Sequence, residues 1–193
     1  MPHFTMPLVA ALCVYLVRIT IMEKVLLIGP GGAGKSTFAK EIGELTGIPV
    51  VHLDALYWKP GWIETSKDDW KRVVEGLLAQ ESWIIDGNYG GTLDLRLAAA
   101  DTIIFFDLPP LLCIWRFLKR RIKFHNKNRP DMTEGCSERI DWSFIKWIYN
   151  YRRDRRPGIM QKLEAVKSEK TIVIFNSPHA VSKFTESIRG KYA

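Results

Sequence analysis

Apolar and polar residues follow one another in blocks along the chain, and the blocks predict a sheet covered by helices. Five short apolar runs, rich in Val and Ile, fit buried parallel strands: 25–28, 49–53, 83–85, 103–106 and 171–175. Longer stretches between them fit helices: 36–46, 66–80, 92–99, 109–123, 139–166 and 180–190. Strands that alternate with helices predict a doubly wound α/β fold with a five-stranded parallel sheet. Ligands of such sheets bind at the carboxyl ends of the strands.

A glycine-rich stretch, GPGGAGKST, follows the first apolar run and precedes the first predicted helix. It matches the P-loop pattern G-x-x-x-x-G-K-[ST] through Gly29, Gly34, Lys35 and Ser36. Backbone amides at a helix N-terminus bind phosphate oxygens, so a nucleoside triphosphate is the expected ligand. The predicted nucleotide-binding residues of this stretch are Gly29, Gly31, Gly32, Ala33, Gly34, Lys35, Ser36 and Thr37. The alternative is a glycine-rich turn that only resembles the motif.

The motif also predicts which groups take part in the chemistry. Lys35 is expected to reach the β- and γ-phosphates of ATP and to act as a catalytic residue. The Ser36 hydroxyl is expected to bind Mg²⁺. ATP and Mg²⁺ are therefore the expected cofactors.

Two carboxylates stand at the ends of predicted strands. Asp86 ends the strand that begins at Trp83, where it is a candidate magnesium ligand together with Ser36. Its alternative is a cap of the turn over 86–88. Asp54 follows the second strand, where it is a candidate to orient the acceptor or to take its proton. A helix N-cap is the alternative for Asp54. His52 is interpreted as structural.

Arginines form the other candidate group. Arg116 and Arg120 are four residues apart and share a helix face, while Arg96 is a candidate acceptor contact. The stretch YRRDRRPG contains the further candidates Arg152 and Arg156. With the polar, turn-rich stretch before it, this cluster predicts an arginine-rich lid over about 124–158. The alternative is a solvated basic helix end.

The charge of the chain is concentrated in one segment. The chain has 193 residues and a net charge of +7, and its length suits a single domain. Residues 116–156 contain 13 Lys and Arg against 5 Asp and Glu, whereas the remainder contains 15 against 16. This segment favours a polyanionic partner, either a nucleotide or a nucleic acid.

The cysteines and the N-terminal stretch bear on location. The three cysteines are scattered, which argues against a disulfide framework and favours a reducing, cytoplasmic location. The apolar run over 7–17 is shorter than the ~20 residues that a membrane span needs. We expect residues 1–21 to be an extension outside the fold, a domain over 22–193, and no membrane partner. The oligomeric state stays open.

Four motifs together resemble a known group: GPGGAGKST, HLDALYW, WIIDGNY and FFDLPPLLCIWRFLKRR. They resemble the adenylate-kinase-like P-loop kinases, and most of all the bacterial DNA topology modulation protein (FlaR-related) family. The resemblance covers about 22–190. It implies a nucleotide-kinase-like fold with a helical lid and an ATP-dependent phosphotransferase activity.

The resemblance also implies roles for individual residues. Arg116 would contact the adenine of ATP and Arg120 its phosphates, and lid arginines such as Arg152 and Arg156 would contact the transferring phosphoryl group. The AMP-site motif of adenylate kinases is absent, which leaves the acceptor open, and Arg96 departs from their acceptor-side spacing. A four-cysteine zinc lid is excluded, because the lid region contains only Cys136.

Two main functions follow from these observations. The leading hypothesis is a kinase that phosphorylates a small acceptor, a nucleotide or a nucleoside. The alternative is a nucleotide-binding, DNA-associated regulatory protein without a dedicated acceptor. It is less favoured, because the basic residues fall where kinases have their lid and no nucleic-acid-binding motif is present. A switch GTPase is a third, weak option, since Asn126-Lys127-Asn128-Arg129 lacks the aspartate of a guanine-binding motif.

Overall fold

The computed structural model describes residues 22–123 and 141–192. A parallel sheet of five strands lies at its centre, in the spatial order β2-β5-β1-β6-β7. Its strands are β1 (Lys24–Ile28), β2 (Val50–His52), β5 (Trp83–Asp86), β6 (Thr102–Phe106) and β7 (Thr171–Phe175). The predicted α/β fold with a five-stranded parallel sheet is confirmed.

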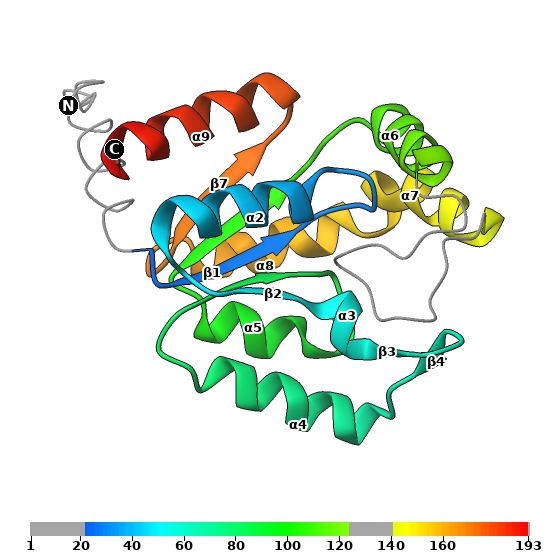
Figure 1. Cartoon of the computed structure of the whole chain (residues 1–193), viewed down its shortest axis with the longest axis horizontal. Helices are drawn as coiled ribbons and strands as arrows, with labels where there is room; N and C mark the ends of the chain where they lie inside the picture. Colours follow the sequence, from blue (N-terminus) through cyan, green and yellow to red (C-terminus); the bar gives the residue numbers. More distant parts are fainter. Residues whose placement is uncertain (1–21, 124–140, 193) are drawn as a thin grey trace, which may run out of the picture.

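Helices connect the strands and cover both faces of the sheet (Figure 1). They are α2 (Lys35–Thr46), α3 (Leu53–Tyr57), α4 (Lys67–Leu78), the 3-10 turn η1 (Gly90–Thr92), α5 (Leu93–Ala99), α6 (Pro110–Lys123), α7 (Trp142–Asp154), α8 (Arg156–Val166) and α9 (Pro178–Tyr192). Within the described residues, every helix is too short or too polar to cross a bilayer. The boundaries agree with the predicted helices to within a few residues, except in the lid region.

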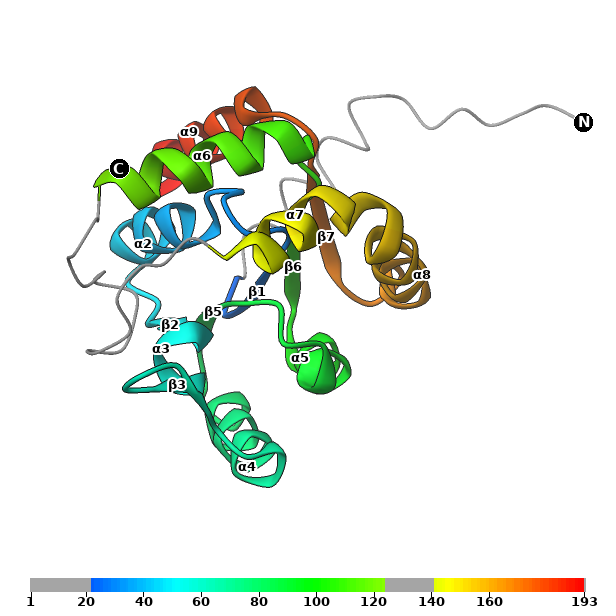
Figure 2. The same cartoon turned by 90° about the vertical axis from the view of Figure 1, so that its right-hand side faces the viewer.

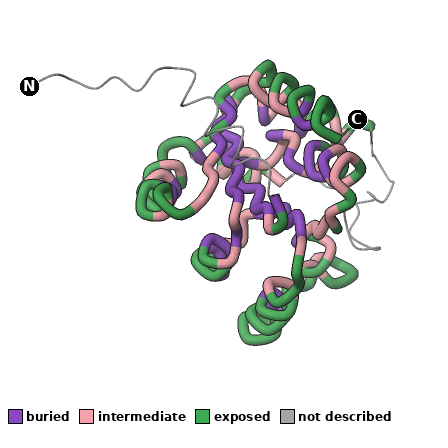
Figure 3. Tube along the Cα trace, turned by 90° about the vertical axis from the view of Figure 1, so that its left-hand side faces the viewer, coloured by how far each residue is buried: buried purple, intermediate pink, exposed green. Residues whose placement is uncertain are grey.

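The core consists of two apolar layers, one on each face of the sheet. Val25 and Leu27 pack with α2 and α9, whereas Leu26 and Ile28 pack with α4, α5 and α8. Because both faces are covered, most strand positions are apolar, rather than only alternate ones. Figure 3 shows the buried strands between exposed outer helix faces. Figure 2 shows α7 at the end of the sheet, where it contributes to both layers.

Two predicted elements are corrected by the structure. The predicted helix 139–166 is two helices, and the segment before residue 141 lies outside the described residues. The helix breaks at Arg155, just before Pro157, because proline has no N–H to donate and its ring clashes with the preceding turn. The predicted strand 49–53 ends at His52, and the short helix α3 and the hairpin of β3 (Trp58–Lys59) and β4 (Ile63–Glu64) follow it.

The order of the strands creates one position where a ligand can approach the sheet. From β1, the chain first connects to β2 on one side, and it returns later to β6 on the other side. The connections on the two sides of β1 therefore diverge and leave a crevice beyond its carboxyl end. The glycine-rich stretch begins at this point, directly after Ile28.

Candidate active site

The glycine-rich stretch forms a tight loop between β1 and the N-terminus of α2. Ala33 N–H donates to the Pro30 carbonyl at 3.3 Å within the loop. Gly32 has φ of 76°, and a Cβ there would lie 2.2 Å from the Cys113 carbonyl oxygen of α6. Only glycine fits at this position, since its backbone is left-handed and another chain segment touches it. The loop therefore has the strand-to-helix setting that a phosphate-binding loop requires.

Lys35 lies over its own loop. Its ammonium group donates to the carbonyl oxygens of Gly29 at 3.0 Å and Pro30 at 3.1 Å, and the residue is buried. A buried ammonium group needs acceptors of this kind. A triphosphate on the loop would offer it stronger, charged acceptors.

Asp86 faces Ser36 and His52 at the end of β5. The Ser36 hydroxyl donates to Asp86 Oδ2 at 2.6 Å, and His52 Nδ1 lies 3.2 Å from the same oxygen. Burial, the largest influence, raises the pKa of Asp86, but the hydrogen bond from His52, the charge of Lys35 and the bond from Ser36 outweigh it. The pKa of Asp86 therefore lies below its ordinary value, and the carboxylate is ionised at neutral pH.

The Ser36 and Asp86 side chains fit a magnesium ion. Both offer hard oxygen donors, which Mg²⁺ prefers, and Mg²⁺ commonly takes only one or two protein ligands beside phosphates and water. Within the described residues, no cluster of three or more His, Cys, Asp or Glu side chains is placed to hold a metal. The carboxylate of Asp86 points at Ser36 and His52 rather than at the amides of the turn that follows it.

Asp54 lies in the first turn of α3 and accepts a hydrogen bond from the Tyr89 hydroxyl at 2.6 Å. The N-cap of α3 is His52, so Asp54 does not cap this helix. Tyr89 packs its ring against Tyr57 at 4.6 Å and Trp70 at 4.9 Å. Burial, followed by the charge of Asp54, raises the pKa of Tyr89, so the phenol stays a donor.

Arg96 has a different role from the predicted one. Its guanidinium is fully buried and donates to four backbone carbonyls: Gly87 at 2.7 Å, Asn88 at 2.8 Å, Tyr89 at 2.7 Å and Thr92 at 3.3 Å. Burial lowers the pKa of Arg96 to about 10, so the group still carries its charge at neutral pH. The prediction that Arg96 contacts the acceptor directly is corrected, because its guanidinium donates its hydrogen bonds to backbone carbonyls of the segment after β5.

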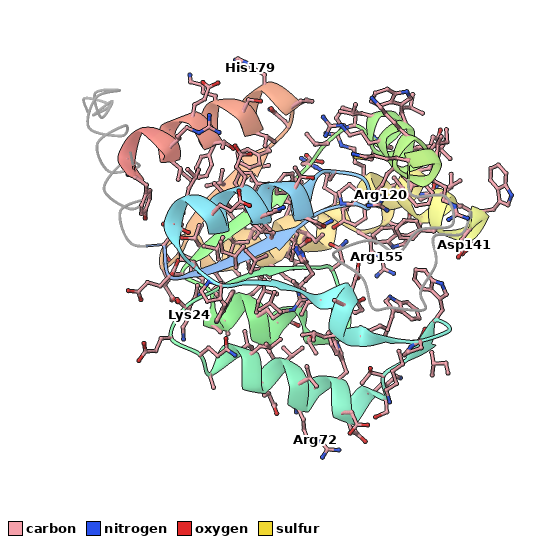
Figure 4. The ribbon with its side chains drawn as sticks, in the orientation of Figure 1. Lys24, Arg72, Arg120, Asp141, Arg155 and His179 are labelled. Carbon is pink, nitrogen blue, oxygen red and sulfur yellow. The ribbon has the colours of Figure 1, made fainter. Side chains whose placement is uncertain are left out.

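The two arginines of α6 lie near the loop end of the molecule. Arg116 Nη1 donates to the Ala33 carbonyl at 3.3 Å, which places this guanidinium beside the glycine-rich loop. The Arg120 guanidinium lies 5.5 Å from the centre of the Phe117 ring. Figure 4 shows Arg120 and Arg155 at the end of the molecule toward which β1 points.

Asp107, directly after β6, forms ion pairs with two of the predicted lid arginines. Arg152 Nε donates to Asp107 Oδ1 at 2.9 Å, and Arg156 Nε donates to Asp107 Oδ2 at 2.8 Å. The hydrogen bond to Asp107 raises the pKa of Arg152. Arg153 instead pairs with its neighbour Asp154 at the surface. The arginines of the cluster therefore have different partners. The part of the predicted lid over 124–140 lies outside the described residues.

A cleft of about 620 Å³ opens beside the loop, between the segment after β5 and helices α7 and α8. Its lining includes Asn88, Tyr89, Trp147, Tyr151, Arg155 and Lys162. Three of these side chains are aromatic and two are cationic. The cleft also reaches Ile28, the last residue of β1, so it meets the start of the glycine-rich loop.

Two residues of this region were not predicted as site residues. His52 pairs with Asp86 in the register of β2 and β5, a contact that only the sheet order creates. Asn88 donates from Nδ2 to the Gly29 carbonyl at 2.6 Å and accepts from the Gly29 N–H at 3.1 Å. In the sequence, Asn88 follows Asp86 and Gly87 at the end of a predicted strand. This position is the one feature from which it could have been predicted as a site residue.

Comparisons with known proteins support the fold. No family model matches the chain, and no curated protein matches it. Its structure is similar to a gluconokinase from Sinorhizobium meliloti 1021, at 16% identity and a TM-score of 0.50, covering 88% of this chain and 91% of that one. It is also similar to a shikimate kinase from Acinetobacter baumannii in complex with shikimate, at 17% identity and a TM-score of 0.55, covering 90% and 94%. The chain thus has the α/β fold of the P-loop kinases, as predicted.

Proposed function

We propose that the chain is a cytoplasmic, ATP-dependent kinase that transfers the γ-phosphoryl group to a small acceptor. The observation that carries this proposal is the arrangement of Lys35, Ser36 and an ionised Asp86 around a strand-loop-helix turn. Loop amides, an ammonium group and oxygen donors are the elements that phosphoryl transfer requires for positioning and charge neutralisation. The similarity in fold to P-loop kinases is in line with it.

In this proposal, the loop from Gly29 to Thr37 binds the phosphates of ATP through its amides and Lys35. Arg116 contacts the adenine and Arg120 the phosphates. Ser36 and Asp86 hold Mg²⁺, which, when bound, neutralises charge on the phosphate oxygens. The Lys35 ammonium leaves the carbonyls of its own loop and moves to the triphosphate.

The acceptor is proposed to bind in the cleft between the segment after β5 and helices α7 and α8. Its aromatic side chains, Tyr89, Trp147 and Tyr151, suit the flat face of a nucleobase. Arg155 and Lys162 suit a phosphate or another anionic group on the acceptor. These features favour a nucleotide or nucleoside, as the sequence predicted, over a small acceptor without a planar ring.

The proposed chemical step combines these groups with Asp54, which is hydrogen-bonded to Tyr89 of the cleft. An acceptor hydroxyl attacks the γ-phosphorus, the bond from that phosphorus to the β–γ bridging oxygen breaks, and ADP leaves. Asp54 takes the hydroxyl proton, while Tyr89 orients the Asp54 carboxylate through its hydrogen bond. Arg152 and Arg156 would exchange Asp107 for the phosphoryl oxygens and stabilise their charge.

The test is a phosphorylation screen with a variant of the loop lysine. Nucleosides, nucleoside monophosphates, gluconate and shikimate are each offered with ATP and Mg²⁺, and hydrolysis of ATP alone sets the baseline. We expect Lys35→Ala to reduce transfer to the best acceptor at least a hundredfold, because the triphosphate loses its main cation. Lys40→Ala is the matched control, since Lys40 lies on the same helix with 76% of its side chain exposed.

The outcome that contradicts the proposal is normal nucleotide turnover by Lys35→Ala, or no transfer to any acceptor by the unchanged chain. The alternative, a DNA-associated regulator, is less favoured here, because Arg116, Arg152 and Arg156 are turned to the loop and to Asp107. A salt-titrated duplex-binding assay separates the two, since tight binding with a steep salt slope would favour the regulator.

A further inference from the structure

The side chain of Asn88 makes a two-point contact with the first residue of the glycine-rich loop. It donates to the Gly29 carbonyl at 2.6 Å and accepts from the Gly29 N–H at 3.1 Å. The two residues are 59 positions apart in the sequence, so the contact joins the loop to the segment after β5. A cyclic pair of this kind fixes both the position and the rotation of the Gly29 peptide groups.

The same Gly29 carbonyl also accepts from Lys35 Nζ at 3.0 Å. When Lys35 moves to a triphosphate, this carbonyl loses one of its two donors. A buried carbonyl without any donor is destabilising, because it has given up its hydrogen bonds to water and gained none in return. Because Asn88 keeps a donor on Gly29, Lys35 can leave without that cost. Asn88 thereby favours the form of the loop that binds nucleotide.

The other side of Asn88 faces α7 and the cleft. The Tyr151 hydroxyl lies 3.3 Å from Asn88 Oδ1, the oxygen that accepts from Gly29. Tyr151 is buried, and burial raises its pKa, so it stays a protonated donor. The Asn88 carbonyl is itself held by Arg96. Both Asn88 and Tyr151 line the cleft proposed for the acceptor.

We infer that Asn88 is a positioning residue that couples the acceptor cleft to the nucleotide loop, with Tyr151 as its partner on α7. This inference rests on the proposed function. Occupation of the cleft acts on Tyr151 and Asn88, and their hydrogen bonds transmit the change to Gly29 and Lys35. Coupling of this kind is reciprocal, so nucleotide binding also orders the acceptor side.

The experiment measures the Kd of a non-hydrolysable ATP analogue with Mg²⁺ on the full chain by calorimetry. Asn88→Ala removes both contacts with Gly29 and is expected to weaken binding about tenfold. Asn88→Asp places a carboxylate oxygen against the Gly29 carbonyl and is expected to weaken binding further. Gln80→Glu makes the same amide-to-acid change at an exposed position at the end of α4, and its Kd is expected to stay unchanged.

Tyr151→Phe provides the second measurement, because it removes one hydroxyl and keeps the ring in place. It is expected to weaken nucleotide binding about threefold alone and to add nothing to Asn88→Ala, since the two residues act through one contact. A merely structural role would lower the melting temperature of the unliganded variants and leave the Kd of the folded protein unchanged.

The outcomes are distinguishable. If the unchanged chain does not bind the ATP analogue, the proposed function fails and this inference falls with it. If the unchanged chain binds and both Asn88 variants bind equally well, the inference alone is overturned. Additive effects of Asn88→Ala and Tyr151→Phe would also overturn it, because they would show independent contributions.

Discussion

At the scale of single residues, the polar groups of the candidate site form hydrogen bonds with one another. Lys35 is held by carbonyls of its own loop, and Asp86 is held by Ser36 and His52. Each of these contacts uses an atom that the proposed mechanism assigns to phosphate or to Mg²⁺. Buried charges need such partners, so the polar groups of the site also stabilise one another.

For Arg96, the sequence indicates an anion-binding candidate but not the partners that the side chain has in the structure. From the sequence, an arginine near the end of a strand is a candidate for anion binding. Its burial and its four carbonyl partners depend on the path of residues 87–92, which no local pattern encodes. Asn88 was missed for the same reason, because its partner Gly29 is distant in the sequence.

The first prediction concerns Arg96. Arg96→Met removes a buried guanidinium that donates to four backbone carbonyls, so the free energy of unfolding should fall by about 3 kcal/mol. Urea unfolding followed by circular dichroism measures this. Arg153→Met is the control, since Arg153 is exposed and, among the described residues, pairs with its neighbour Asp154. Its effect should stay within about 0.5 kcal/mol. An unchanged free energy of unfolding for Arg96→Met would contradict this structural role and make Arg96 a candidate ligand contact again.

At the scale of elements, the strands and most helices follow from the sequence alone. Continuous apolar runs identify the five parallel strands because both faces of the sheet are covered. The hairpin of β3 and β4 was not predictable, since strands of two residues are too short to show an alternation of apolar and polar positions. Next to the hairpin, the Tyr57 ring packs on the Trp70 ring at 5.0 Å, a contact between residues distant in the sequence. The break between α7 and α8 was predictable in principle from Pro157.

The second prediction concerns how α7 and α8 are tied to the sheet. Asp107 is buried and is shared by Arg152 of α7 and Arg156 of α8, whose side chains are 43% and 41% exposed. Asp107→Asn removes the charge and keeps a hydrogen-bond acceptor. The two arginines should then be freer to bind phosphate, and the Kd of an ATP analogue should fall several-fold while the melting temperature decreases.

Calorimetry and a thermal melt together test this expectation. Asp94→Asn is a matched control, because Asp94 pairs with Lys162 at the surface of α5 and has no contact with the arginine cluster. Weaker nucleotide binding by Asp107→Asn would show that the arginines do not compete between Asp107 and phosphate. In that case, Arg152 and Arg156 would only hold α7 and α8 to the sheet through Asp107.

At the scale of the whole molecule, the described core begins at Met22. Met22 is 4% exposed and packs into the layer that contains α2 and α9, and β1 begins two residues later. Within the part of the chain that the structure describes, the sheet, its two apolar layers and the candidate site consist of residues from Met22 onward. The domain prediction of 22–193 therefore leads to an experiment on the entire chain.

The last prediction is that a chain starting at Met22 keeps both its stability and its ligand response. Stability is expected to match that of the full chain, because the described core layers begin at Met22 and are kept whole. An ATP analogue with Mg²⁺, at a hundred times its Kd, should stabilise both chains by about 2.7 kcal/mol, since it binds only the folded state. Thermal melts with and without ligand measure this, and Lys35→Ala in each chain should remove the ligand effect. A lower melting temperature, or a smaller ligand effect, in the shorter chain would show that residues 1–21 contribute to the fold or to nucleotide binding.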